Sequence, residues 1–177
     1  MITIETASDS TPEGLSTPTL TRFLNRARTA IGLRGTVDVL LTTDSTLRRL
    51  NKNFRGKDKP TDVLSFPAPA AFARKHAGDL AISIDTAAQQ AKAFAHPFTA
   101  EIKILILHGL LHLAGEDHET DHGQMATREA TLRRELRLPA TLIERTARKT
   151  TKKHLTTTKQ PQKTTQKPPS KSRRGGK

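Results

Sequence analysis

The 177-residue sequence predicts one α+β domain built around a small sheet of about four strands. Short apolar runs typical of strands alternate with longer stretches in which apolar residues recur at helical spacing. Hydrophobic residues make up 34% of the chain and aromatic residues 3%, with neither Trp nor Tyr. The core must therefore be built from Leu, Ile, Val, Ala and Phe.

The first part of the chain predicts three strands and two helices. Alternating residues predict a short edge strand at 2–4, and Thr17 to about Ile31 follow a helical period that Gly32 and Gly35 end. A strand is expected at 36–42. The next helix carries Leu47, Leu50 and Phe54 and is capped by Asp44 or Ser45. A strong apolar strand follows at 62–66 and stops at Pro67.

The second part predicts one strand and three helices. Residues 68–77 are expected to form a loop, and residues 78–84 a strand. Asp85 is predicted to cap a helix that runs to about Phe94. A strongly apolar helix begins at Pro97 or Thr99 and stops at Gly115, and a last helix runs from about Asp121 to Leu136.

The positive charge of the chain is concentrated at its C-terminal end. The formal net charge is +13, but residues 148–177 hold 11 of the 30 Lys and Arg residues and none of the acidic ones. The rest of the chain is therefore close to neutral. Without an apolar period, residues 146–177 are predicted to form a disordered tail after a domain at 1–145. Two roles are open for this tail: it keeps the protein soluble, or it tethers the protein to RNA without regard to sequence.

Several classes of protein are excluded or disfavoured. The chain has no cysteine, which excludes a disulfide framework, a Cys-ligated zinc site, an iron–sulfur cluster and a cysteine nucleophile. No apolar run is long enough for a membrane span. The first ten residues lack the basic and apolar regions of a signal peptide. We therefore expect a soluble cytoplasmic protein.

Three closely spaced histidines predict a metal site. His108 and His112 are four residues apart, so on a helix they lie one turn apart on the same face. Gly115 gives the backbone the freedom to turn, which can bring His118 to the same ion. Three neutral nitrogens leave a fourth position for water, as in catalytic zinc sites. Such an ion lowers the pKa of its water to about 7 and polarises a carbonyl or phosphoryl oxygen.

Other interpretations of these residues exist. In one alternative, the three histidines are only polar residues at the edge of a core helix and bind no metal. Their imidazoles would then lie beside an apolar run without hydrogen-bond partners. His122 lies beyond the turn in a polar stretch and is not expected to be a ligand. The spacing matches that of metzincin peptidases, which carry a glutamate general base after the first histidine. Gly109 stands there instead. Asp117 is expected either to orient a ligand histidine or to act as a base.

A basic loop before the apolar strand at 62–66 is the second informative segment. Arg55, Lys57 and Lys59 can contact phosphates, and the arginine can do so through two nitrogens at once. A solvated turn is the alternative. The scarcity of aromatic residues predicts that any RNA is recognised by backbone and shape rather than by base stacking.

Together these segments resemble the YbeY family of bacterial endoribonucleases and ribosomal-RNA maturation factors. The resemblance rests on Arg55–Pro67, Gly78–Ser83 and His108–His118, and covers roughly residues 1–145. It implies a zincin-like fold in which the histidine-bearing helix packs beside a small mixed sheet. It also implies one Zn²⁺ held by His108, His112 and His118, and a functionally important arginine at Arg55. Glu116 departs from the family pattern and adds a negative charge near the RNA path.

The resemblance implies a zinc-dependent endoribonuclease that cleaves single-stranded RNA, matures the 3′ end of 16S rRNA and takes part in ribosome quality control. The expected partners are the 16S precursor and the small ribosomal subunit, with no membrane. A non-catalytic ribosome assembly factor with a structural metal is the alternative, and a metallopeptidase is the next. The sequence leaves the cleavage site, protein partners, oligomeric state and identity of the divalent ion open.

Overall fold

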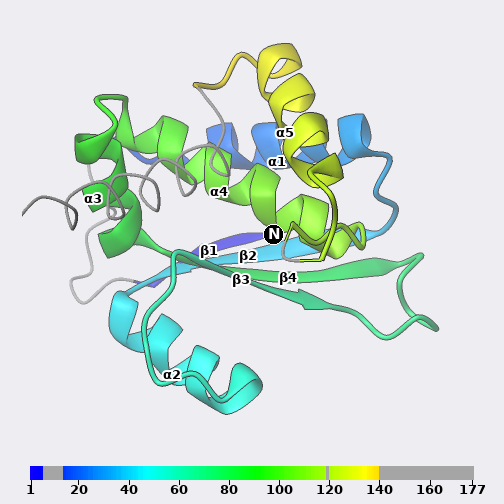
Figure 1. Ribbon diagram of the computed structural model, residues 1–177, viewed down its shortest axis with the longest axis horizontal. Coiled ribbons are helices and arrows are strands. Elements are labelled where there is room, and N and C mark those ends of the chain that lie inside the picture. Colours follow the sequence, from blue (N-terminus) through cyan, green and yellow to red (C-terminus); the bar gives the residue numbers. More distant parts are fainter. Residues whose placement is uncertain (6–13, 119, 140–177) are drawn as a thin grey trace, which may run out of the picture.

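The computed structural model describes residues 1–5, 14–118 and 120–139, which form four strands and five helices in one mixed α+β domain (Figure 1). In chain order the elements are β1 (Ile2–Ile4), α1 (Thr17–Ile31), β2 (Thr36–Thr42), α2 (Asp44–Arg55), β3 (Val63–Pro67), β4 (His76–Ser83), α3 (Ile84–Ala93), α4 (Phe98–Leu113) and α5 (Gln124–Glu135). The predicted α+β class and small sheet are confirmed. The tail predicted at 146–177 lies outside the described residues.

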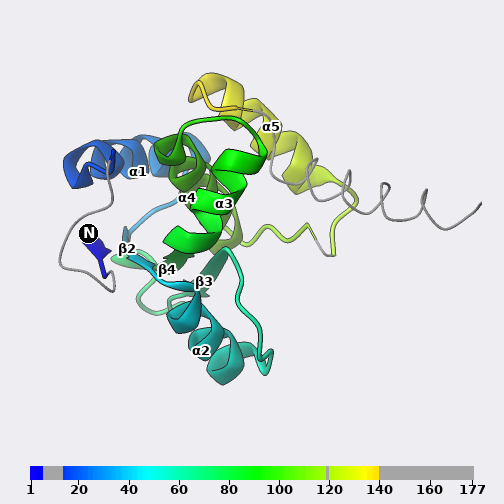
Figure 2. The ribbon, with the colours of Figure 1, turned by 90° about the vertical axis from the view of Figure 1, so that its left-hand side faces the viewer.

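The sheet has the strand order β1-β2-β4-β3, and it is mixed. β1 and β4 both pair with β2 in parallel, whereas β3 pairs with β4 antiparallel and forms one edge of the sheet. Helices α1, α3, α4 and α5 cover one face, and α2 lies alone on the other (Figures 1 and 2). Among the described residues, no helix is long and apolar enough to cross a membrane.

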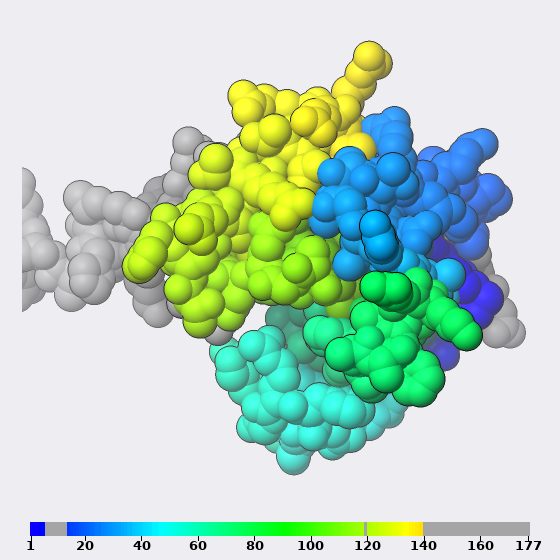
Figure 3. All heavy atoms as spheres, turned by 90° about the vertical axis from the view of Figure 1, so that its right-hand side faces the viewer, coloured from blue at the N-terminus to red at the C-terminus, as the bar shows by residue number. Residues whose placement is uncertain are grey.

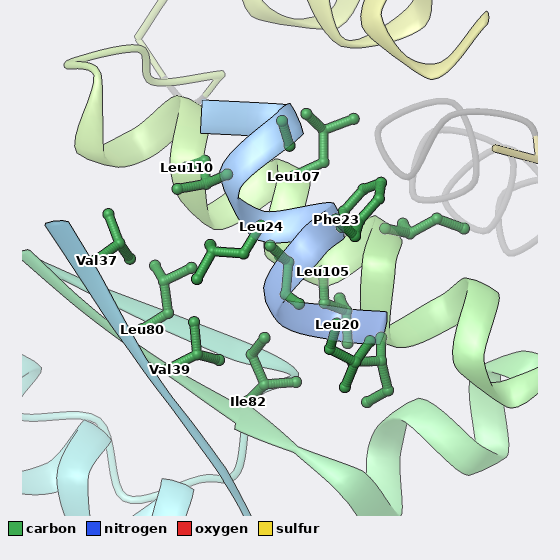
Figure 4. Close-up of a cluster of buried hydrophobic side chains, with 14 of the residues drawn as sticks. Leu20, Phe23, Leu24, Val37, Val39, Leu80, Ile82, Leu105, Leu107 and Leu110 are labelled. Atoms are coloured by element: carbon green, nitrogen blue, oxygen red, sulfur yellow. The ribbon is translucent and has the colours of Figure 1, made fainter. Parts of the chain in front are cut away.

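Helix α4 is the centre of the hydrophobic core. Eleven of its sixteen residues are buried, on all sides of the helix rather than along one stripe, which is the pattern of a helix enclosed by other elements. Figure 4 shows apolar side chains of α1, α4, β2 and β4 meeting between helices and sheet; those labelled are Leu20, Phe23, Leu24, Val37, Val39, Leu80, Ile82, Leu105, Leu107 and Leu110. Each fully buried leucine contributes about 1.5–3 kcal/mol to folding.

The caps of α2 and α3 differ from the prediction. Thr43 caps α2 instead of Asp44 or Ser45, and Ser83 caps α3 instead of Asp85. The two aspartates are used between the helices. The Asp85 carboxylate accepts a hydrogen bond from the backbone N–H of Asp44 at 2.9 Å, and the Asp44 carboxylate accepts from the Thr86 hydroxyl at 2.7 Å. The local caps thus lie one residue earlier than predicted for Asp44 and two residues earlier for Asp85, and the aspartates join the two helix starts.

Two further boundaries differ from the prediction. β4 begins at His76, inside the predicted loop, because the chain there already pairs with Thr36 of β2. α5 begins at Gln124 rather than at about Asp121. The Asp121 carboxylate accepts hydrogen bonds from the backbone N–H groups of Gly123 and Met125, at 2.8 and 2.6 Å, and these bonds lower its pKa. Asp121 thus stabilises the start of the helix from outside it.

Gly109 lies where α4 packs closely against the sheet. A methyl group added to Gly109 would lie 2.7 and 3.1 Å from the two terminal carbons of Leu80 and 3.3 Å from Ser65 Oγ. The Ser65 hydroxyl also donates a hydrogen bond to the Gly109 carbonyl at 3.2 Å. Leu80 is buried on all sides and has little room to move away. A glutamate, which metzincins carry at this position, would require Leu80 to repack.

Gly109→Ala is expected to lower the free energy of unfolding by about 1 kcal/mol. Overpacking against Leu80 costs about 1–3 kcal/mol, whereas the higher helix propensity of alanine returns about 1 kcal/mol. Denaturant unfolding of both proteins measures the difference. Because the two effects have opposite signs, a more stable variant would show that the α4–sheet contact is looser than described.

Candidate metal centre

Three imidazoles converge on one point at the C-terminal end of α4. His108 and His112 lie one helical turn apart, and their Nε2 atoms are 3.2 Å from each other. The ring of His118, from the segment after the helix, lies 5.2 and 5.4 Å from the other two ring centres. One ring nitrogen from each histidine lies within 4.8 Å of the others. The structure therefore brings together the three histidines that the spacing predicted.

The turn that returns His118 to this point is a Schellman motif. The N–H of Gly115 bonds to the carbonyl of His112 at 3.0 Å, and the N–H of Glu116 bonds to the carbonyl of Leu111 at 3.1 Å. Gly115 has a φ of +88°, a conformation in which a side chain is strained. The glycine therefore ends the helix and reverses the chain toward the other two histidines.

The spacing of these nitrogens fits tetrahedral coordination of one ion. Two nitrogens each about 2.0–2.1 Å from a tetrahedral ion are about 3.3–3.4 Å apart, close to the 3.2 Å between His108 and His112. Imidazole nitrogen is a ligand that Zn²⁺ prefers, and it also binds nickel, copper and cobalt. The group could hold a metal ion, and His118 is its exposed member.

Glu129 of α5 fixes the orientation of His108. Its carboxylate contacts His108 Nδ1 at 3.0 Å, which directs Nε2 of the same ring toward His112. The second carboxylate oxygen accepts a hydrogen bond from Arg133 Nε at 2.8 Å, and Glu129 is fully buried. A carboxylate behind a ligand histidine holds the ring and its tautomer and raises its basicity.

The sequence prediction missed Glu129. The available signal was its position on α5, where Met125, Glu129, Leu132 and Leu136 form the buried stripe. A carboxylate among the apolar positions of a helix requires a partner in the core. The spacing alone does not reveal that this partner is a histidine 21 residues earlier.

Burial lowers the pKa of His112, and the neighbouring imidazoles of His108 and His118 lower it further. The charge of Asp117 and a hydrogen bond to the backbone of Glu116 oppose this effect. The lowered pKa favours the neutral ring, which is the form that binds a metal.

The two acidic residues before His118 have different surroundings. Glu116 forms an ion pair with Arg128 of α5, so the negative charge expected near the RNA path is compensated. Asp117 is half-buried near His112, and its backbone carbonyl accepts hydrogen bonds from the N–H groups of Thr120 and Asp121. The carboxylate against His108 is Glu129 and not Asp117.

Arg55 is exposed at the C-terminal end of α2, on the other face of the sheet from α4. Asp58 pairs with Arg48 at 2.6 Å and with Lys52 at 3.2 Å, which ties the basic loop to the helix. These pairs leave Lys57, like Arg55, exposed to solvent.

A hollow separates the two regions in Figure 3. It lies between the yellow-green surface that continues from α4 and the cyan surface of α2, with the darker surface of β3 at its floor. Helix α4, which carries two of the histidines, and helix α2, which leads into the basic loop, both contact the edge strand β3.

Asp38, His76 and Asp79 form a second group that could hold a metal among the described residues. Asp38 already pairs with the N-terminal ammonium of Met1, and His76 pairs with Asp79 at 3.2 Å. These pairings account for the group without an ion.

A family model described as "Endoribonuclease YbeY" matches residues 4–137. The chain belongs to the YbeY family. Curated endoribonucleases YbeY from Koribacter versatilis and Solibacter usitatus are 53% and 48% identical to it, each over 76% of this chain and 87% and 88% of their own lengths. The solution structure of TM1509 from Thermotoga maritima is 27% identical and aligns with a TM-score of 0.51, covering 77% of this chain and 89% of that one.

Glu129→Gln is expected to weaken Zn²⁺ binding about tenfold or more. Glutamine has one acceptor oxygen in place of two, so His108 and Arg133 can no longer each donate to an oxygen of their own. The side-chain NH2 group of the glutamine would face one of these two N–H donors. Competition with a chromophoric chelator measures the affinity, and thermal unfolding reports the cost of losing the Glu129–Arg133 ion pair. Glu135→Gln, on the exposed side of the same helix, is the control. Unchanged zinc affinity in a folded Glu129→Gln protein would contradict the orienting role.

Proposed function

We propose that the protein is a zinc-dependent endoribonuclease that cleaves single-stranded RNA, matures the 3′ end of 16S rRNA and contributes to ribosome quality control. The observation that carries this proposal is the convergence of three imidazoles, backed by buried Glu129, in a chain of the YbeY family. We also propose that the fold is zincin-like. This proposal is supported by α4, which carries two of the histidines beside a mixed sheet.

His108, His112 and His118 would hold one Zn²⁺ ion. When bound, such an ion supplies an acidified water ligand and a positive charge for a phosphoryl oxygen. Glu129 keeps the His108 ring in place, and the Schellman turn keeps His118 within reach. Metallopeptidase activity is disfavoured because Gly109 stands at the position of its general base and supplies no carboxylate there, and a side chain at this position would crowd Leu80.

Arg55 would stabilise the negative charge that develops on the phosphoryl group, as preorganised cations do in phosphoryl transfer. Its exposed guanidinium lies on α2, which borders the hollow in Figure 3. Asp117 would take a proton from the attacking water. This role is favoured over orientation of a ligand because Glu129 already holds His108, whereas Asp117 lies beside His112 and next to His118 in the chain.

The proposed partners are the precursor of 16S rRNA and the small ribosomal subunit, in the cytoplasm. Unpaired RNA exposes its phosphates and base edges to such a hollow more fully than an A-form duplex does. The proposal divides the chain into a catalytic domain at 1–145 and a basic tail at 146–177. The concentrated positive charge of the tail would attract RNA phosphates without regard to sequence.

Two substitutions are expected to separate metal binding from cleavage. His112→Ala should lose both zinc and cleavage of a single-stranded RNA that carries the precursor 3′ end of 16S rRNA. Arg55→Ala should keep about one zinc ion and lose about 100-fold or more in cleavage rate. Metal analysis and gel assays of the same preparations provide both measurements. His122→Ala and Arg49→Ala, which change exposed residues of the same types, are the matched controls.

Two results would contradict the catalytic proposal. The first is zinc binding without cleavage by the wild-type protein, which would favour an assembly factor with a structural metal. The second is cleavage that persists unchanged in His112→Ala and Arg55→Ala, since that is the behaviour of a contaminating nuclease.

Asp117→Asn is expected to keep the zinc affinity and lower the rate constant of cleavage about 100-fold, the lower end of what a general base contributes. Single-turnover cleavage at saturating protein, together with a zinc titration, makes the distinction. If zinc affinity falls in parallel with cleavage, Asp117 orients a ligand histidine and is not the base.

A further inference from the structure

Phe54 exposes its ring at the end of α2. Its relative exposure is 67%, and among the described residues only Met1 and Phe72 are other large hydrophobic side chains with comparable exposure. The ring is nevertheless held in place. It meets Phe66 of β3 edge-on, with ring centres 5.1 Å apart and an interplanar angle of 70°. Much of this positioned aromatic ring is thus exposed to solvent, where a flat ligand can stack on it.

The position of Phe54 relates this ring to both parts of the candidate site. Arg55 is the next residue, and Lys57 follows in the basic loop, so positive charge adjoins the ring. Phe66 continues toward α4 through its neighbour Ser65, whose hydroxyl donates to the carbonyl of Gly109, the residue after His108. β3 is the edge strand of the sheet. The hollow in Figure 3, between the surface that continues from α4 and the surface of α2, gives a ligand a path across this edge.

We propose that Phe54 is a stacking site for one unpaired base of the RNA, with Phe66 supporting the ring and Arg55 and Lys57 contacting the adjacent phosphates. An aromatic ring beside cations matches the two repeating chemical features of single-stranded nucleic acid, a flat base and an anionic phosphate. The site rests on the proposed function and adds to it a selection for unpaired substrate, because a base inside a duplex has no free face.

The occupant is an RNA base rather than an apolar protein surface because of the surrounding charge. Arg48 and Lys52 are paired with Asp58, so the acidic charge of the loop is already compensated. The residues nearest the ring in sequence add net positive charge, which favours a polyanion. A single stacked base departs from the expectation that RNA is recognised by backbone and shape, since one suitably placed ring is sufficient for one base.

The test combines a protein variant with a modified RNA. Phe54→Leu keeps an apolar contact with Phe66 but removes the flat face, and Phe54→Trp restores a flat face. Phe72→Leu changes the other exposed phenylalanine, 62% exposed, and is the matched control. Each full-length, zinc-loaded protein is assayed for the KM and kcat of cleavage of a short unpaired RNA. Anisotropy measures its binding to that RNA and to the same backbone with abasic residues.

The expected result is a loss of binding that depends on the bases. Phe54→Leu should weaken binding of the ordinary RNA about fivefold or more and raise KM more than it lowers kcat. Phe54→Trp should recover the affinity, and Phe72→Leu should resemble the wild type. On the abasic RNA, Phe54→Leu and the wild type should bind equally.

Three results would overturn the stacking site. Equal weakening on ordinary and abasic RNA would make Phe54 a purely structural residue. If Phe54→Leu binds ordinary RNA as tightly as the wild type does, the exposed ring does not stack on a base and is instead a candidate contact for a protein partner. Cleavage by the wild type would still support the nuclease proposal in that case. Failure of the wild type to bind RNA at all would overturn the nuclease proposal and the stacking site together.

Discussion

The burial of α4 is the constraint on which the rest of the structure depends. A helix enclosed by the sheet and three other helices has little freedom to shift or rotate, so the imidazoles at its C-terminal end have fixed directions. The same burial requires Gly109 on the side facing β3 and β4, where the backbone meets Leu80 and Ser65. Stability of the core and geometry of the histidine group are therefore two results of one packing arrangement.

A chain of polar contacts continues from this helix into α5. Three buried residues form it: His108, Glu129 and Arg133. Glu129 contacts His108 through one carboxylate oxygen and Arg133 through the other. Arg133 Nη1 in turn donates to the carbonyl of Pro139 at 2.9 Å. Buried polar groups are tolerated when they are hydrogen-bonded in this way. The group that could bind a metal is thus anchored in the fold, although His118 itself remains exposed.

The sequence predicted the features that depend on local pattern. The helical period of α1, the alternation in β2 and the spacing of His108, His112 and Gly115 are visible within a few residues, and the structure places these elements accordingly. What the sequence could not predict depends on distant partners. Asp44 and Asp85 bridge the starts of two helices and leave the caps to Thr43 and Ser83, and Glu129 faces a histidine on another helix. The exposure of Phe54 likewise follows from where α2 meets the edge strand.

The close approach at Gly109 has an evolutionary consequence. The three histidines share their spacing with peptidases whose glutamate stands directly after the first histidine. A side chain placed here would press on the ends of the Leu80 side chain and crowd Ser65, so Leu80 would have to repack. The change from one chemistry to the other therefore carries a cost in folding stability in addition to a new catalytic group.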